Sequence, residues 1–209
     1  MRLSPDNELA HCFLSHLLIY EGKFDEGLEH ARRAAQVDYD SPMTVVTEPW
    51  LMLFADRLDE ALDTAERVVT QRFDQSAPGH IILGHIYLAA GATERALDEY
   101  RTARRNDRLL DAIGSEGYVY GLMGDRTKAL KCMSSLRRAQ ISWPTAYVSS
   151  YYDALIWTGL DEKEKALDAL EKAYEEKCDW LVQLAVEPRW KRLHDEPRFK
   201  NLREKVGLG

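Results

Sequence analysis

The sequence predicts an all-α protein made of consecutive helical hairpins. The chain has 209 residues, of which 45% are apolar and 30% charged, and this balance is typical of a folded globular protein. Its 12 glycines and 7 prolines are too few for the many turns of an all-β protein. A small residue followed by leucine recurs about every 34 residues, and this period is typical of repeats of two helices.

The recurring pairs mark the second helix of each expected hairpin. They are Gly27-Leu28, Ala61-Leu62, Ala96-Leu97, Ala129-Leu130 and Ala166-Leu167. Twelve residues before each pair, the first helix carries another residue that is mostly small: Ser15, Pro49, Gly84, Gly117 or Ala154. Antiparallel helices approach closely where both carry small side chains, so each unit is expected to be a helix–turn–helix.

Five such units follow one another along the chain. The expected repeats are residues 8–41, 42–75, 77–110, 110–143 and 147–180. A charged, helix-starting segment precedes each small–Leu pair, as in Arg57-Leu-Asp-Glu60. Residues 1–7 are interpreted as the tail of an upstream repeat or as a leader. Pro49 stands inside the first helix of the second repeat, so we expect that helix to kink or to start late.

After the repeats, the tail holds two near-copies of one heptapeptide. They are Glu187-Pro-Arg-Trp-Lys-Arg-Leu193 and Glu196-Pro-Arg-Phe-Lys-Asn-Leu202. Proline suits the first turn of a helix, so we predict a short helical turn over 188–193 and a helix over 197–206. Residues 181–209 are therefore expected to form a capping segment that covers the last apolar face of the array.

The period and the pattern resemble the tetratricopeptide repeat over residues 8–177. The third copy matches best, with Leu83-Gly84-x-x-Tyr87, Gly91, Ala96, Tyr100 and Ala103 at consensus positions. Two features depart from the family pattern. The consensus Trp is replaced by His11, Val45, His80, Ile113 and Ser150, and the closing Pro is absent from all five copies. The resemblance implies a right-handed α-solenoid of about five hairpins and a protein-binding role.

The region from Tyr147 to Leu208 also resembles the C-terminal tetratricopeptide region of bacterial signalling and transcription-regulatory proteins. In those proteins a DNA-binding, cyclase or kinase domain precedes the repeats. This resemblance implies an alternative function, in which the chain is a regulatory arm and an upstream effector domain is missing from it.

Composition disfavours several classes of partner and location. The net charge of −7 repels phosphate backbones, so nucleic acid is not expected as a partner. No apolar run is long enough for a membrane span, and the N-terminus lacks the apolar core of a signal peptide. The three cysteines are an odd number and form no CxxC pair, which favours a reduced, cytoplasmic compartment.

Motifs that would carry chemistry are absent from the sequence. There is no HExxH, no Cys/His cluster, no phosphate-binding GxxxxGK[ST] loop and no GxSxG elbow, so we expect no metal, no cofactor and no enzyme activity. One pair leaves a third alternative, a small helical enzyme. His16 follows Cys12 by four residues on an expected helix, and such a pair could lower the pKa of the thiol.

The resemblance implies that the first helix of each hairpin lines a concave binding face. The side chains expected there are His16, Trp50, Ile81, His85, Tyr118, Tyr151 and Leu155. The groove positions carry no Lys, Arg or Asn, so the carboxylate clamp of chaperone-binding family members has no candidates. We therefore predict a non-catalytic module that binds an apolar or aromatic peptide or partner helix. The alternative is that these side chains pack between neighbouring repeats.

Overall fold

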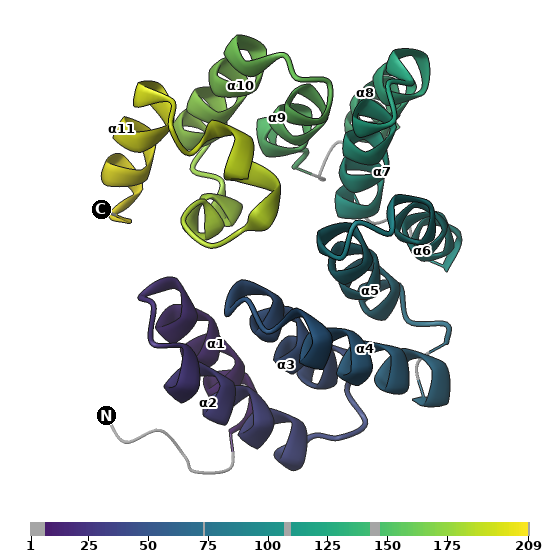
Figure 1. The fold of residues 1–209 in the computed structure, drawn as a ribbon, viewed down its shortest axis with the longest axis vertical. Coiled ribbons are helices and arrows are strands. Elements are labelled where there is room, and N and C mark those ends of the chain that lie inside the picture. The colour runs from purple at the N-terminus through teal and green to yellow at the C-terminus, as the bar shows by residue number, and fades with distance from the viewer. Residues whose placement is uncertain (1–6, 73, 107–109, 143–146, 209) are drawn as a thin grey trace. The chain divides into compact units, whose positions relative to one another are not determined.

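The computed structural model describes residues 7–72, 74–106, 110–142 and 147–208 (Figure 1). All regular secondary structure in these ranges is helical, so the predicted all-α class is confirmed. The chain divides into two compact units, Met1–Asn106 and Asp107–Gly209, and each is described by itself. The predicted leader, residues 1–7, lies outside the described residues except for Asn7, whose side chain accepts a hydrogen bond from the Ala10 N–H.

The first unit consists of three helical hairpins. Its helices are α1 (Glu8–Tyr20), α2 (Phe24–Val37), α3 (Pro42–Phe54), α4 (Leu58–Arg72), α5 (Ala77–Ala89) and α6 (Thr93–Asn106). Each odd-numbered helix packs against the even-numbered helix that follows it. The hairpins also stack, because α3 packs on α1 and α2, and α5 packs on α3 and α4. The first helix of each hairpin therefore contacts the whole of the preceding hairpin.

The second unit contains two hairpins and the tail. Its elements are α7 (Leu110–Leu122), α8 (Arg126–Ser142), α9 (Ser150–Gly159), α10 (Lys163–Glu175), the 3₁₀ helices η1 (Asp179–Gln183) and η2 (Pro188–Leu193), and α11 (Pro197–Val206). The predicted turn over 188–193 and the predicted helix over 197–206 are both confirmed. In this unit η2 packs on α9, and α11 packs on α10.

Every hairpin turns through one residue in the left-handed backbone region, always five residues before the small residue of the recurring pair. These residues are Gly22, Asp56, Gly91, Gly124 and Asp161, with φ between 58° and 78°. At Gly91 the N–H donates to the Leu88 carbonyl at 3.1 Å, and the next N–H donates to the Tyr87 carbonyl at 2.8 Å. These bonds satisfy carbonyls that the end of the first helix would otherwise leave unpaired.

The second hairpin contradicts one expectation. Helix α3 begins at Pro42 and continues through Pro49 to Phe54, so the prediction of a late start is wrong. Pro42 occupies the first turn, where a missing N–H has no cost, and this position favours an early start. The Pro49 ring is buried. Packing of the apolar α3 against its neighbours therefore outweighs the loss of one helical hydrogen bond.

Small residues allow close packing both within a hairpin and between neighbouring hairpins. A Cβ atom at Gly84 would lie 2.6 Å from the ring of Tyr100, and one at Gly117 would lie 2.7 Å from Ile156. In the third hairpin, glycine on α5 thus makes room for a large side chain on α6. Tyr100 fills that space and is fully buried.

Candidate functional site

Four aromatic rings from the first helices of two consecutive hairpins form a cluster in the first unit. The cluster consists of His16 and Tyr20 on α1 and Trp50 and Phe54 on α3. The His16 and Trp50 rings meet edge to face with centroids 5.1 Å apart, and Trp50 lies 5.7 Å from Phe54. Tyr20 lies 6.0 Å from His16 and 6.4 Å from Phe54. We call these four residues the aromatic cluster.

The hairpin repeat explains why these rings meet. His16 and Trp50 hold the same position in their repeats, and Tyr20 and Phe54 hold the position one helical turn later. Because α3 packs on α1, equivalent positions on the two helices become neighbours. Phe54 is buried, whereas His16, Tyr20 and Trp50 are half-buried and reach the surface. The cluster is therefore an accessible aromatic surface with a buried base.

Two other predicted groove residues of this unit lie in its core. Ile81 on α5 is buried. His85, one helical turn further along, turns toward α6, where its Nδ1 lies 2.7 Å from the Tyr100 hydroxyl. The aromatic surface therefore ends at α3 and does not continue onto α5.

Cys12 and His16 do not form a nucleophile–base pair. The His16 Nδ1–H donates to the backbone carbonyl of Cys12 at 2.8 Å, because a carbonyl oxygen can only accept. Burial raises the pKa of the Cys12 thiol and lowers the pKa of His16. A buried thiol with a raised pKa is a poor nucleophile, and this geometry disfavours the alternative of a small helical enzyme.

In the second unit, the predicted groove residues lie beneath the tail. Tyr118, Tyr151 and Leu155 are all buried. The Tyr151 ring meets the ring of Trp190 from η2 edge to face, with centroids 5.2 Å apart. Burial raises the pKa of Tyr118, with Arg189 and Arg192 of the tail among the nearby charges. The face that would bind a ligand in this unit is thus packed against residues of its own chain.

A buried polar network holds η2 in this position. The guanidinium of Arg189 donates to both carboxylate oxygens of Glu187, at 2.9 and 3.0 Å. Its Nη1 also donates to the Ser115 hydroxyl on α7 at 2.7 Å, and Ser115 donates to Asp111 at 3.1 Å. The sequence predicts a capping segment over 181–209 but not these contacts, because nothing in a local pattern links Arg189 to Ser115.

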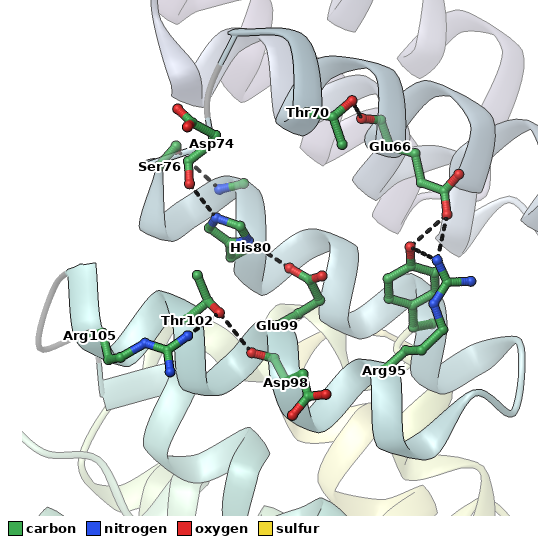
Figure 2. Close-up of polar contacts among 12 residues, drawn as sticks. Glu66, Thr70, Asp74, Ser76, His80, Arg95, Asp98, Glu99, Thr102 and Arg105 are labelled. Carbon is green, nitrogen blue, oxygen red and sulfur yellow. Dashed lines mark hydrogen bonds and ion pairs between the residues drawn. The ribbon is translucent and has the colours of Figure 1, made fainter.

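A second feature of the first unit is an open pocket of about 720 Å³ lined mainly by residues of α4, α5 and α6. Figure 2 shows polar contacts of this region. On one side of the pocket, the Tyr87 hydroxyl donates to Glu66 at 2.6 Å and accepts from Arg95 at 2.7 Å. Burial and the bond to Glu66 raise the pKa of Tyr87 to about 12. These groups join α4 to α5 and α6, so we assign the pocket to contacts between hairpins.

On the other side of the pocket, His80 is held at both ring nitrogens. Its Nδ1 lies 2.6 Å from a Glu99 carboxylate oxygen on α6, and its Nε2 lies 2.7 Å from the Asp74 carbonyl (Figure 2). Both partners accept, so both nitrogens donate, as in the charged imidazolium. The bond to Glu99 raises the pKa of His80 despite partial burial.

This arrangement predicts a pH-dependent contribution of His80 to stability. A raised pKa in the folded state stabilises the protein fully below the unfolded value of about 6.5, and the contribution disappears as the pH rises through the folded value. His80→Gln is therefore expected to cost about 1 to 3 kcal/mol at pH 5.5 and clearly less at pH 8.5. Urea unfolding of both proteins across this range measures the difference. A cost that stays constant with pH would contradict the charged contact.

Within the described ranges, no group of three or more His, Cys, Asp or Glu side chains is arranged to hold a metal ion. The helices of these ranges include none with the length and hydropathy needed to cross a bilayer.

The solved structures similar to this chain include tetratricopeptide repeat proteins. One, a thermophilic protein from Thermus thermophilus, has a TM-score of 0.62 and 21% identity, over 88% of this chain and 98% of that chain. A tetratricopeptide repeat protein from Parabacteroides merdae has a TM-score of 0.50 and 14% identity, over 96% of this chain and 78% of that chain. At these identities the likeness shows the fold alone, and it confirms the predicted array of tetratricopeptide-type hairpins.

A chain from the structure of Naa15/Naa10 bound to HypK-THB is similar over 94% of this chain and 30% of its own length, with a TM-score of 0.53 and 14% identity. No protein-family model matches the sequence, and no curated protein matches it.

Proposed function

We propose that this chain, which has the tetratricopeptide repeat fold, is a non-catalytic protein-interaction module. In this proposal the aromatic cluster of His16, Tyr20, Trp50 and Phe54 binds an apolar or aromatic segment of a partner protein. The observation that carries the proposal is the half-buried Trp50, packed between rings from two hairpins. Aromatic side chains in such settings contribute a large share of binding energy at protein interfaces.

The electrostatics of the cluster favour an uncharged ligand. Burial lowers the pKa of His16, so its imidazole is neutral at neutral pH. The groove positions of both hairpins carry no Lys or Arg to pair with a carboxylate. A rigid, partly buried aromatic surface also loses little conformational entropy on binding. These features support an apolar or aromatic segment over a free C-terminal carboxylate.

The proposal narrows the predicted groove to its accessible part. His16 and Trp50 remain as binding residues, Tyr20 is added to them, and the buried Phe54 forms the base beneath Tyr20 and Trp50. We assign Ile81, His85, Tyr118, Tyr151 and Leu155 to packing, because their side chains are buried. The similar chain from the Naa15/Naa10 assembly, which is bound to HypK-THB, supports a role in protein complexes.

The resemblance of residues 147–208 to bacterial signalling and transcription-regulatory proteins supports a finer proposal, in which the module is the regulatory arm of a longer cytoplasmic protein. The two proposals agree on how the module acts, because a regulatory arm also works by binding a partner. They differ in the effector domain that the finer proposal requires upstream of the repeats.

The test is selection of peptides from a random display library on the purified chain. We expect the selected peptides to be rich in Trp, Phe, Tyr and Leu. Trp50→Ala should weaken their binding about 30-fold or more, the loss typical of a central aromatic contact. Trp157→Ala is the matched control, because this half-buried indole lies on α9 of the second unit, beside Lys165.

The melting temperature of each variant separates binding from packing. Lost affinity at an unchanged melting temperature supports the aromatic cluster as the site. If Trp50→Ala lowers the melting temperature but its folded fraction binds the peptides with unchanged affinity, the ring is part of the core and the proposal is wrong. Equal losses with Trp157→Ala would also contradict it.

A further inference from the structure

Helix α1 exposes a stripe of three large apolar side chains. Leu9, Phe13 and Leu17 are 56%, 69% and 59% exposed, and their spacing of four residues places them on one face of the helix. No other helix in the described ranges exposes three large apolar side chains. We call these three residues the α1 stripe. An apolar row of this kind on the surface of a soluble domain indicates an interaction site.

The positions equivalent to the α1 stripe can be compared in the later hairpins. Phe13 and Leu17 lie fourteen and ten residues before the small residue of their hairpin, Gly27. The residues at these two positions in the later hairpins are all buried: Thr47 and Leu51, Ile82 and Ile86, Ser115 and Val119, Tyr152 and Ile156. Exposure at these positions is therefore confined to α1.

Stacking buries these positions in the later hairpins. In the first unit, α3 packs on both helices of the first hairpin, and α5 packs on both helices of the second. In the second unit, α9 packs in the same way on α7 and α8. The α1 stripe is thus the exposed continuation of the hairpin–hairpin interface at the start of the first unit.

We propose that a second copy of this chain covers the α1 stripe. The order of residues along the stripe is symmetric about Phe13, because a leucine lies four residues before it and another lies four residues after it. Two antiparallel α1 helices related by a twofold axis beside Phe13 place Leu9 of each copy against Leu17 of the other. Such an interface is isologous and closes as a dimer. Rows of residues four apart also interlock in the commonest class of helix packing.

Charge does not oppose this pairing. Glu8 is the single Asp, Glu, Lys or Arg residue within Glu8–Tyr20, and it lies at the end of the helix, away from Phe13. One helix per copy buries less surface than the roughly 800 Å² per partner of a standard interface. The dimer is therefore expected to be weak, with a dissociation constant of roughly 10 to 100 µM.

Sedimentation equilibrium of the full chain from about 1 to 300 µM tests the proposal, with the range set to bracket the expected affinity. The average mass should rise from that of a monomer toward twice that value. Phe13→Asp should remain monomeric throughout and keep its melting temperature, because the side chain it replaces is exposed. Ile141→Asp is the control, since Ile141 on α8 is 79% exposed and lies outside the stripe.

Charge exchange tests the register. Leu9→Lys and Leu17→Asp should each weaken association when alone, and mixing the two variants should restore it, because position 9 of one copy faces position 17 of the other. Mixing Leu9→Lys with Leu9→Asp should not restore it. A chain that is monomeric at 300 µM would overturn the proposal. The α1 stripe would then be a candidate contact surface for a different protein. Growth beyond a dimer, or equal loss with Ile141→Asp, would overturn it as well.

Discussion

Replacing Arg189 with alanine is expected to lower the free energy of unfolding by about 3 to 5 kcal/mol. The guanidinium is buried, and its loss leaves the Glu187 carboxylate, which is only 2% exposed, without a compensating charge. The Ser115 hydroxyl would lose its donor in the same step. Urea unfolding followed by circular dichroism measures the effect. An unpaired buried charge is among the most destabilising outcomes of a single substitution.

The second heptapeptide supplies the control. Arg198 stands where Arg189 stands in the first copy, but it lies at the surface and contacts Glu164, Asp168 and Glu171 of α10. Because these charges are solvated, Arg198→Ala is expected to cost about 1 kcal/mol or less. Arg189→Met combined with Glu187→Leu should recover much of the lost stability, since the charge is then removed together with its partner. Equal effects of the two alanine substitutions would contradict a buried network.

Replacing Gly159 with alanine is expected to cost about 3 kcal/mol or more, at or above the upper end of the overpacking range. A Cβ atom at Gly159 would collide with the Tyr118 carbonyl oxygen, and one at Gly121 would lie 2.5 Å from the Gly159 carbonyl carbon. Both neighbours are backbone atoms, so no side-chain rotation relieves the contact. Helices α7 and α9 would have to separate over their whole contact, and thermal unfolding measures the resulting loss.

Gly117→Ala on α7 is the matched control for this prediction. Its new Cβ would meet side-chain atoms of Ile156 and Cys132, at 2.7 Å or more, and no backbone atom of the neighbouring helix is among its nearest contacts. The better helix propensity of alanine offsets part of the cost, by about 1 kcal/mol. We therefore expect Gly117→Ala to be clearly less destabilising than Gly159→Ala. The reverse order would show that side-chain crowding, and not backbone contact, limits the approach of these helices.

The hairpins could be predicted from sequence because their determinants are local and recur. Each helix is predicted from features that lie within a few residues of it: the small residues, the charged helix starts and the prolines at 188 and 197. The same features recur from one copy to the next. Pro49 shows the limit of this reasoning. Proline begins helix α3 at position 42, and the same residue type predicts a disturbed helix at position 49. Burial of the apolar helix around Pro49 outweighs this unfavourable effect of proline on the helix.

The candidate site could be predicted only in part, for a related reason. The repeat register identified His16 and Trp50 as groove residues, and their rings do meet. The same repeat register predicts Tyr118 and Tyr151 as groove residues. It contains no information about the C-terminal tail that packs over them. The contact between Arg189 and Ser115 joins residues 74 positions apart, and no periodic pattern encodes such a pair.

The five left-handed turn residues have a consequence for how such proteins are recognised. Aspartate replaces glycine at two of these turns, and the consensus Trp and closing Pro of the family are missing, yet the backbone turns in the same way each time. The turn therefore needs one residue that tolerates a positive φ, which either glycine or aspartate supplies, and it does not need the consensus Trp or the closing Pro. Comparison by residue identity loses such hairpins with evolutionary distance, whereas comparison by shape retains them.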